Sequence, residues 1–370
     1  LAVAVGTSED ETGLVLVGLV GLADAPRPQA IEAVRHAQDA GVRVVMITGD
    51  HALTAGAIAR EIGIVGPGRD EADVVFARKT AADKTTIVAA KRKQGEVVAM
   101  TGDGVNDAPS IREADIGIAM GKGATEVTRE AADMILTDDD LGGVVTAIRE
   151  GRIVYDNIRK TVVYLLAGNA AGLVAMLFAA AIGWPLPLLP LHLLWLNIMC
   201  EPLPGLALAI DPPDDDVMRR NPRAPNTPLL GRESWLHIAW VAALQAAVSL
   251  AAFGWGLHHG DLALARTLAF STLVFGVLLR AFSARNHDKV LWEVGYSRNL
   301  VLLVVVVISV GLQLALLAVP WTREVFELAR LTVGQVLAAL ALGFVPVSVV
   351  ETTKLVRRLW APREHQPRIA

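Results

Sequence analysis

The chain has 370 residues, of which 53% are hydrophobic, and a formal net charge of −4. Its mean hydropathy of +0.45 indicates a protein with a large apolar part, and the small negative charge argues against a nucleic-acid partner, which would need a basic surface. A single cysteine, Cys200, excludes an internal disulfide framework.

The first part of the chain predicts an α/β domain over residues 1–150. Short β-branched runs alternate there with helical patterns, which favours a parallel sheet with crossover helices. The predicted strands are 15–19, 42–47, 74–76, 97–100, 116–119 and 134–136, and the predicted helices are 31–40, 53–62 and 85–93.

Two further segments of this domain, a strand-to-helix turn and the start of a helix, carry groups that suit a phosphate. Thr48-Gly49-Asp50 follows the strand 42–47, and a hydroxyl with backbone N–H groups at such a turn can bind an anion. Taken alone, an ordinary turn with a helix cap explains these three residues equally well. Asp83-Lys84 opens the helix 85–93, where a lone lysine is usually a solvated side chain.

The turn after the strand 97–100 is more specific, because it combines two carboxylates with two glycines. Its sequence is Met100-Thr-Gly-Asp-Gly-Val-Asn-Asp-Ala-Pro-Ser110. A carboxylate at the C-terminal end of a parallel strand faces the ligand crevice, and Mg²⁺ usually takes one or two protein carboxylates plus phosphate oxygens. Asp103 is therefore the expected Mg²⁺ ligand. Asn106 and Asp107 are expected to cap the next helix or to support the metal through its ligands.

Residues 151–370 predict a transmembrane domain. Crossing a bilayer takes about 20 apolar residues, and six stretches qualify: about 162–182, 188–210, 235–257, 264–282, 300–319 and 331–355. Every second connection is rich in lysine and arginine, which predicts that both termini and the α/β domain face the cytoplasm. These positive connections carry Lys160 before the first stretch, Arg219 and Arg220 after the second, Arg280 and Arg285 after the fourth, and Arg357 and Arg358 after the sixth.

Polar residues inside a membrane span are costly and therefore suspected of function. Asn197 and Glu201 lie four residues apart, on one face of an α-helix. Two prolines, Pro202 and Pro204, follow and should break that helix and free backbone carbonyls. Carboxylate, amide and carbonyl oxygens suit a hard cation, and Asn169 can add another.

Other interpretations of these span residues stay open. Glu201 could be protonated and hydrogen-bonded to a neighbouring helix, and Asn169 could make a plain interhelical hydrogen bond. Cys200 is more often a small buried hydrophobe than a ligand for a soft metal.

The order of the soluble motifs resembles the phosphorylation domain of P-type cation-transporting ATPases. The motifs are Asp24-Ala-Pro-Arg-Pro28, Met46-Ile-Thr-Gly-Asp50, Phe76-Ala-Arg78, Asp83-Lys84, Thr101-Gly-Asp-Gly-Val-Asn-Asp107 and Asp115-Ile-Gly-Ile-Ala-Met-Gly121. The resemblance implies a partial Rossmann-like domain of the haloacid-dehalogenase type. It also implies that Thr48, Gly49 and Asp50 contact the phosphoryl group. Lys84 would neutralise that group, and Arg78 would join the ATP site. Asp103 would hold Mg²⁺, with Asn106 and Asp107 ordering the site.

The membrane part resembles the calcium-pump-like P2 branch of the same family. The resemblance rests on Leu194-Trp-Leu-Asn197, Pro202-Leu-Pro-Gly205, Asp211-Pro-Pro-Asp214 and Met218-Arg-Arg-Asn-Pro-Arg223. It implies that Asn169, Asn197 and Glu201 bind the transported cation. Two-site calcium pumps carry carboxylates where this chain has Gly172 and Val277, so the resemblance implies one ion site, for Ca²⁺ or Mn²⁺.

The resemblance implies a divalent-cation pump that works through an aspartyl phosphate in a bacterial plasma membrane. The chain has no Asp-Lys-Thr-Gly-Thr phosphorylation motif, actuator loop or nucleotide-binding domain, so the missing N-terminal part is expected in a longer or separate chain. A haloacid-dehalogenase-type phosphatase fused to a membrane domain is an alternative, although Asp138-Asp-Asp140 lies too late in the domain to be its nucleophile motif. A non-catalytic membrane subunit that binds cations is another.

Overall fold

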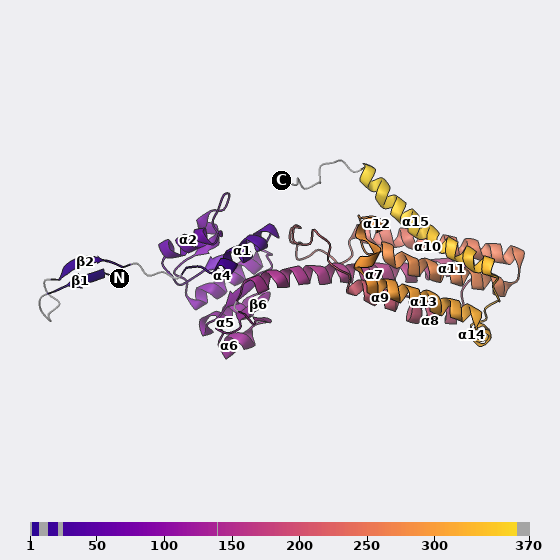
Figure 1. Cartoon of the computed structure of the whole chain (residues 1–370), viewed down its shortest axis with the longest axis horizontal. Coiled ribbons are helices and arrows are strands. Elements are labelled where there is room, and N and C mark those ends of the chain that lie inside the picture. Colours follow the sequence, from indigo (N-terminus) through magenta and orange to yellow (C-terminus); the bar gives the residue numbers. More distant parts are fainter. Residues whose placement is uncertain (1, 7–13, 21–24, 139, 361–370) are drawn as a thin grey trace. The chain divides into compact units, whose positions relative to one another are not determined.

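The computed structural model describes residues 2–6, 14–20, 25–138 and 140–360. Asp24 and Asp139, which belong to motifs noted above, lie outside the described residues. The chain divides into two compact units. One comprises Leu1–Arg149 with Met218–Pro225, and the other Glu150–Val217 with Asn226–Ala370. Figure 1 shows the course of the chain through both.

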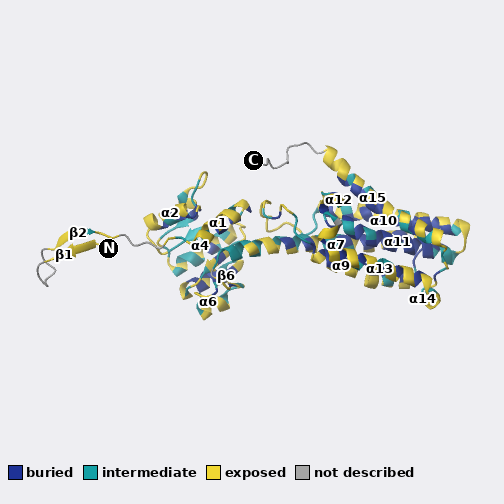
Figure 2. Ribbon diagram, in the orientation of Figure 1, coloured by how far each residue is buried: buried dark blue, intermediate teal, exposed yellow. Residues whose placement is uncertain are grey.

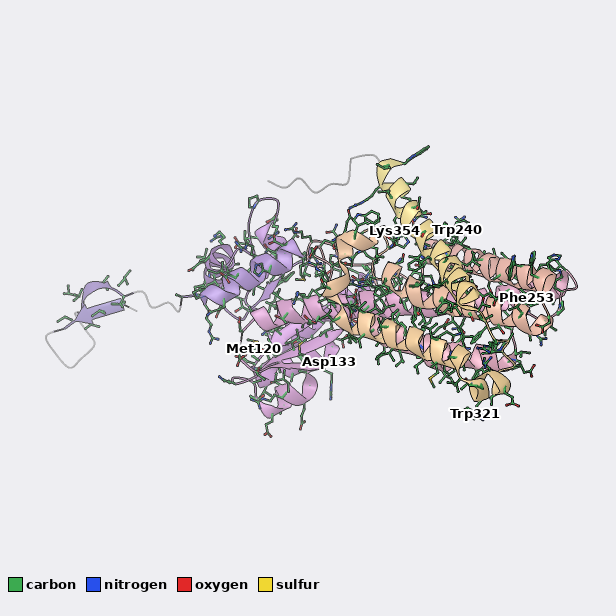
Figure 3. All side chains as sticks on the ribbon, turned by 45° about the vertical axis from the view of Figure 1, so that its right-hand side comes forward. Met120, Asp133, Trp240, Phe253, Trp321 and Lys354 are labelled. Carbon is green, nitrogen blue, oxygen red and sulfur yellow. The ribbon has the colours of Figure 1, made fainter. Side chains whose placement is uncertain are left out.

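The first unit contains the expected parallel strands, in two separate sheets. β3 (Met46–Ile47) pairs with β4 (Val75–Phe76), while β5 (Ala99–Gly102), β6 (Ile116–Met120) and β7 (Met134–Leu136) form a three-stranded sheet in the order β5-β6-β7. Asp133 lies beside this sheet, and its Oδ2 accepts the Gly117 N–H at 2.7 Å (Figure 3). The parallel-sheet prediction is confirmed.

Helices pack against these strands and bury the apolar side chains of both. They are α1 (Pro28–Asp39), α2 (Ala52–Glu61), α3 (Glu71–Val74), α4 (Ala81–Lys93), α5 (Ala108–Glu113) and α6 (Glu126–Ala131), with a 3₁₀ turn η1 (Val105–Asp107) before α5. One small core joins Val34, Ala59 and Val74. A second joins Val88 of α4, Met100 of β5 and Ile111 of α5. The second core fixes α4 and α5 beside the end of β5.

The strand at residues 15–19 does not join a parallel sheet, so that part of the prediction is wrong. β2 (Val15–Leu19) pairs antiparallel with β1 (Ala2–Val5) instead. A parallel pair needs a crossover of about a dozen residues or more, whereas a short connection permits only the antiparallel arrangement. The pair is largely exposed, with Leu19 78% exposed (Figure 2).

The second unit is a helical bundle, and six of its described helices are long and apolar enough to cross a membrane. They are α7 (Gly142–Ala181), a second span made of α8 (Pro190–Trp195), the π-helix η2 (Leu196–Cys200) and α9 (Pro202–Ala209), then α10 (Arg232–His259), α11 (Leu262–Ser283), α13 (Leu300–Ala318) and α15 (Val333–Trp360). Short helices α12 (Leu291–Val294), η3 (Tyr296–Arg298) and α14 (Pro320–Val325) lie in the connections. The prediction of six membrane helices is confirmed.

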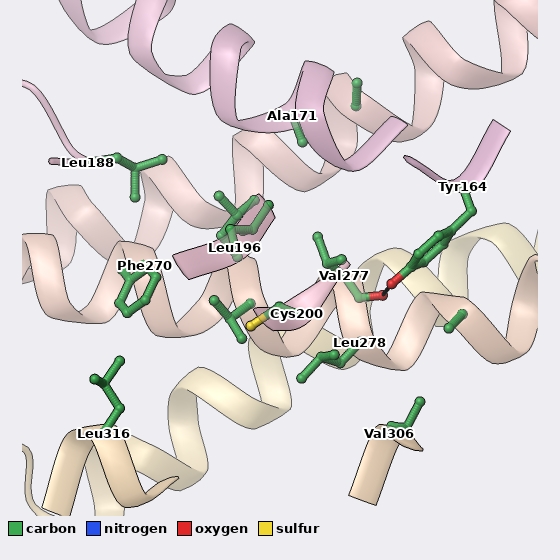
Figure 4. Packing of buried hydrophobic residues seen from close by; sticks show 14 of the residues in the cluster. Tyr164, Ala171, Leu188, Leu196, Cys200, Phe270, Val277, Leu278, Val306 and Leu316 are labelled. Carbon is green, nitrogen blue, oxygen red and sulfur yellow. Dashed lines mark hydrogen bonds between the residues drawn. The ribbon is translucent and has the colours of Figure 1, made fainter. Parts of the chain in front are cut away.

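Helix α11 forms the centre of the bundle. Of the most apolar segment of α11, 72% is buried inside the protein, a larger share than in any of the other five spans. The helix packs against α9, α10, α13 and α15. Gly276 of α11 and Gly343 of α15 approach so closely that a Cβ on Gly343 would lie 2.9 Å from the Gly276 nitrogen, which is how small residues let membrane helices pack. Figure 4 shows the core that results, with Tyr164, Leu196, Cys200, Phe270 and Val277.

Candidate functional site

The turn after β5 is compact because Gly102 and Asp107 are in contact. A Cβ on Gly102 would lie 2.5 Å from the Asp107 Cβ and 2.8 Å from its Oδ2, so only glycine fits there. The Asp107 N–H donates to the Gly104 carbonyl at 2.9 Å, which closes η1. Asp103 and Asn106 are exposed on the same turn, whereas Asp107 is buried. The turn therefore presents one carboxylate outward and holds the other inside.

Lys84 is the partner of the inner carboxylate. Its Nζ lies 2.5 Å from Asp107 Oδ1, and the two side chains are only 18% and 12% exposed. This contact occupies Asp107, whose side chain does not cap α5. The expectation that Asp107 could cap the following helix is wrong, because its carboxylate is used by the lysine instead.

Lys84 reaches this position because α4 begins one turn earlier than the sequence pattern predicts. Thr80 caps the helix: its Oγ1 accepts the Asp83 N–H at 3.3 Å, and Asp83 Oδ2 accepts the Thr80 N–H at 2.9 Å. This reciprocal pair is a capping box. The hydrogen bonds from Thr80, first from its backbone and then from its hydroxyl, lower the pKa of Asp83 below its ordinary value. Lys84 therefore lies in the first turn of α4, facing η1.

The Thr48 turn is joined to the chain that follows β4. The Thr48 N–H donates to the Phe76 carbonyl at 3.0 Å, the Lys79 N–H to the Thr48 carbonyl at 2.9 Å, and the Arg78 N–H to the Asp50 carbonyl at 2.9 Å. Arg78 has a φ of 54°, a conformation uncommon for residues other than glycine. Thr48 Oγ1 accepts the Asp50 N–H at 3.1 Å, while His51 caps α2. Thr48, Gly49, Asp50 and Arg78 thus form one connected surface.

The donors in the first unit suit Mg²⁺ bound together with a phosphate. Among the described residues, no group of three or more His, Cys, Asp or Glu is placed to hold a metal by itself. Mg²⁺ rarely needs such a cage, since it keeps waters and takes phosphate oxygens beside one or two carboxylates. The exposed Asp103 carboxylate at the end of β5 is such a ligand, and the cationic Lys84 beside Asp107 is suited to a phosphoryl group.

In the bundle, Glu201 is 1% exposed, and its carboxylate is only half satisfied. Its Oε2 accepts from Asn169 Nδ2 at 2.7 Å. Its Oε1 is buried and, within the described part of the chain, has no hydrogen-bond partner. A Cβ on Gly168 would lie 2.0 Å from this oxygen. Glycine at 168 therefore makes the room into which Oε1 points.

Arg280 is the functional candidate that the sequence analysis missed, because it was counted with the positive connection after the fourth span. It lies inside α11 and is 3% exposed. Its Nη2 donates to the Tyr164 carbonyl at 2.8 Å, and its guanidinium lies 4.8 Å from the centre of the Tyr164 ring. Its position within the predicted stretch 264–282 was the available signal, since an arginine inside a span is a functional suspect.

Asn197 and Glu201, which are expected on one helix face, differ in burial. Asn197 is exposed, whereas Glu201 is buried. The intervening turn is a π-helix, in which the Glu201 N–H donates to the Leu196 carbonyl at 3.0 Å. The helix is interrupted at Glu201, just before the prolines, and Pro202 begins a new helix, α9, where its missing N–H is tolerated. Cys200 is buried in the apolar core of Figure 4.

The Asp211-Pro-Pro-Asp214 segment after this span is held by a buried polar cluster. Asp211 Oδ1 accepts from Arg285 Nε and Asn299 Nδ2, each at 2.8 Å, and the Asp211 carbonyl accepts from Asn157 Nδ2 at 2.8 Å. Asn299 Nδ2 also donates to the Ala207 carbonyl at 3.0 Å. The cluster fixes the end of α9 against α7 and α13.

Comparisons with known proteins match both units. The model of the cation transporting ATPase C-terminus matches residues 185–356, and that of haloacid dehalogenase-like hydrolases matches residues 4–115. A calcium-transporting ATPase of Bacillus subtilis is 36% identical over 369 residues, covering 94% of this chain and 41% of the relative. Calcium-transporting ATPase 1 of Lactococcus lactis is 34% identical over 371 residues, covering 95% and 42%. The probable cation-transporting ATPase F of Mycobacterium tuberculosis is 37% identical over 374 residues, covering 94% and 41%. The chain thus spans about two fifths of the length of these relatives.

Proposed function

The chain belongs to the P-type cation-transporting ATPases, whose C-terminal portion it matches, and we propose that it forms part of a pump that moves a divalent cation across a membrane. The family uses ATP and Mg²⁺ in general. The transported ion is proposed to be Ca²⁺ or Mn²⁺, because hard divalent cations prefer carboxylate and amide oxygens. The names of relatives as calcium-transporting ATPases support the same choice.

In this proposal the first unit handles the phosphoryl group of an aspartyl phosphate formed on a segment outside this chain. Asp103 holds the Mg²⁺ that supplies charge neutralisation when bound. Thr48 and Gly49 contact the phosphoryl oxygens, and Lys84 balances their charge while its pair with Asp107 keeps its position. Asp50 and Arg78 shape the same surface, and Asn106 orders the turn. Phosphoryl transfer depends on such positioning and electrostatics.

The single observation that carries the transport proposal is the half-satisfied carboxylate of Glu201. A carboxylate oxygen buried without a partner in an apolar bundle is costly, and a bound cation would satisfy it. Asn169, which contacts the same carboxylate, supplies an amide oxygen or orients Glu201. Asn197 stays a candidate cation ligand only if the π-helical segment η2 changes its conformation, because the Asn197 side chain is exposed.

The arrangement in the membrane follows from charge. The chain is an integral multi-pass membrane protein, with six candidate spans among the described residues. We place both termini and the first unit in the cytoplasm because the alternate connections are positive. We also propose that the membrane that the chain crosses is the bacterial plasma membrane. The partner that completes the pump is the N-terminal part with the phosphorylated aspartate, in the same polypeptide or a separate one.

The test joins this chain to the N-terminal segments of a relative and measures phosphorylation from ATP across a series of Ca²⁺ and Mn²⁺ concentrations. Glu201→Gln is expected to raise the cation concentration for half-maximal phosphorylation at least ~10-fold, the effect of removing one charged ligand interaction of about 1.4 kcal/mol or more. Glu233→Gln, at an exposed position in the first turn of α10, is the matched control. Unchanged cation dependence in Glu201→Gln would refute the site.

A further inference from the structure

A segment that the proposed phosphoryl site does not include lies against the Asp103 turn. This segment, residues 121–128, connects β6 with the first turn of α6. The Thr125 N–H donates to the Asp103 carbonyl at 3.1 Å, and Thr128 Oγ1 donates to the Gly104 carbonyl at 3.0 Å. The segment therefore holds the backbone carbonyls of the expected Mg²⁺ ligand and of the residue that follows it.

The Thr128 hydroxyl is committed to this contact. Thr128 is 0% exposed, and the Thr125 hydroxyl lies 2.8 Å from Thr128 Oγ1. Because Thr128 gives its one hydroxyl proton to the Gly104 carbonyl, the Thr125 hydroxyl is the donor between the two threonines. The Gly104 carbonyl also accepts the Asp107 N–H at 2.9 Å. Both lone pairs of this carbonyl are thus used, one by the turn itself and one by the segment.

The segment is in turn fixed to the three-stranded sheet. It begins directly after Met120, the last residue of β6 (Figure 3). The Gly121 N–H donates to the Leu136 carbonyl of β7 at 2.6 Å, and the Arg129 guanidinium of α6 donates to the Gly121 carbonyl. The segment is therefore held at its start by β7 and closed by α6, so it offers the Asp103 turn a rigid support.

The position of the Asp103 carboxylate depends on its backbone. Asp103 is exposed, and within the described part of the chain its side chain makes no hydrogen bond or ion pair. A Cβ on Gly123 would lie 3.9 Å from the Asp103 Cβ and 4.0 Å from its Oδ2, which is an ordinary contact distance. Since Mg²⁺ demands near-ideal octahedral geometry, a carboxylate that only its backbone places needs a backbone that is fixed.

We propose that Thr125 and Thr128 are positioning residues for Mg²⁺ at Asp103. They fix the two peptide groups from which the carboxylate projects, and so lower the Mg²⁺ concentration that phosphorylation requires. The inference rests on the proposed function, because it concerns the same Mg²⁺ site. Thr128 is buried and its hydroxyl is used by the Gly104 carbonyl, so it acts through the backbone and not as a ligand. Groups that orient a metal ligand in this way affect metal affinity without touching the metal.

The first measurement needs no activity. In the full chain in lipid nanodiscs, hydrogen exchange at the amides of Asp107 and Thr125 reports on the carbonyls of Gly104 and Asp103, to which these amides donate. Thr128→Val keeps the shape of the side chain and removes the hydroxyl. It is expected to speed exchange at both amides about 5-fold, the scale of one intramolecular hydrogen bond. Thr128→Ser, which keeps the hydroxyl, is expected to exchange as the wild type does.

The second measurement is phosphoenzyme level against Mg²⁺ concentration, with the chain joined to the N-terminal segments of a relative. Thr128→Val is expected to raise the Mg²⁺ concentration for half-maximal phosphorylation ~10-fold, the scale for losing a group that orients a metal ligand. The level at saturating Mg²⁺ is expected to stay that of the wild type, and Thr128→Ser is expected to restore the wild-type Mg²⁺ dependence.

Thr125→Ala removes the hydroxyl beside Thr128 and keeps the backbone N–H. It is expected to raise the half-maximal Mg²⁺ concentration by a smaller factor, and it provides the test if Thr128→Val does not fold or is not phosphorylated. The control is Thr86→Val on α4, where the exposed hydroxyl donates to the Ala82 carbonyl of its own helix at 2.9 Å. This variant is expected to behave as the wild type in both measurements.

Three outcomes would overturn the inference while Asp103→Asn still abolishes Mg²⁺-dependent phosphorylation. They are an unchanged Mg²⁺ dependence in Thr128→Val, whatever its hydrogen exchange, an unchanged exchange at Asp107 and Thr125, and a Thr128→Ser variant that behaves like Thr128→Val. If Asp103→Asn leaves the Mg²⁺ dependence unchanged as well, the proposed Mg²⁺ site itself is refuted.

Discussion

Lys84 and Asp107, 23 residues apart in the sequence, meet through a 2.5 Å contact between Nζ and Oδ1. The lysine comes from the first turn of α4 and the carboxylate from η1, so the pair joins two segments that the sequence presents as separate motifs. Both side chains are mostly buried, and loss of either would leave the other charge without its partner.

Lys84→Met is expected to destabilise the first unit by about 2 kcal/mol, because the Asp107 carboxylate would be left buried and unpaired. It is also expected to reduce phosphoenzyme formation at least ~100-fold in the completed pump, the scale for losing one preorganised charge at a transferring phosphoryl group. Lys84→Arg keeps the charge and is expected to recover most of the stability but less of the activity. Thermal unfolding and phosphorylation from labelled ATP measure the two effects. A Lys84→Met protein as stable as the wild type would contradict the structural role.

Asp103→Asn is expected to abolish Mg²⁺-dependent phosphoenzyme formation and leave stability nearly unchanged, because Asp103 is exposed at the end of β5 and its carboxylate is proposed to hold the metal. Asp73→Asn, an exposed position on α3, serves as the control for a change of net charge. The measurement is phosphoenzyme level against Mg²⁺ concentration. Normal levels in Asp103→Asn would remove Asp103 from the proposed site.

Gly168→Ala is expected to weaken cation binding at least ~10-fold, since the new methyl group would occupy the position of Glu201 Oε1, 2.0 Å away, and cores rarely absorb such overlap without cost. Gly205→Ala is the matched control. Its Cβ would meet Leu165 Cδ2 at 3.4 Å, an ordinary contact. The measurement is equilibrium ⁴⁵Ca²⁺ binding to both variants. If Gly168→Ala bound Ca²⁺ as tightly as Gly205→Ala, Glu201 Oε1 would not be a ligand.

Acidification is expected to loosen the first turn of α4 through Asp83. Hydrogen bonds from Thr80 lower the pKa of Asp83 in the folded protein. Its stabilising effect is therefore complete above the unfolded value of about 3.9 and disappears as the pH falls through the lower folded value. The amides of Asp83 and Lys84, which donate to Thr80, are expected to be protected from hydrogen exchange at pH 5 and to lose part of that protection near pH 3. Thr80→Ala should show the weaker protection at both pH values, and full protection in that variant would exclude the capping box as the cause.

The sequence pattern predicted the elements whose signal is local. The strand at 134–136 was placed with the bounds that the structure gives, and all six membrane stretches correspond to helices among the described residues. The start of α4 was missed by four residues because its cap, Thr80, precedes a weakly amphipathic segment that periodicity does not mark. Long-range pairing was harder. Nothing local distinguishes a strand that joins β1 in a hairpin from one that enters a parallel sheet.

The candidate sites show the same difference between local and long-range features. Motif order placed Thr48, Lys84, Asp103 and Asp107 in one unit, but the contact between Lys84 and Asp107 depends on how α4 packs beside β5. In the bundle, the contact between Asn169 and Glu201 was compatible with the sequence. The burial of Arg280 inside the bundle was missed, because a count of positive charges near span ends does not tell a buried arginine from a solvated one.

The π-helical segment η2 fits one residue more into the second span than a continuous α-helix would. A π turn holds one residue more than an α turn, and each residue of an α-helix corresponds to about 100° of rotation. Removing one residue between Leu196 and Cys200 would therefore let the segment relax to α-helix and leave the faces on either side nearly unchanged. Removing one residue from α8 instead would turn the start of the span by about 100° relative to Glu201. The two deletions change the chain length equally, but only the second would turn the two halves of the span against each other.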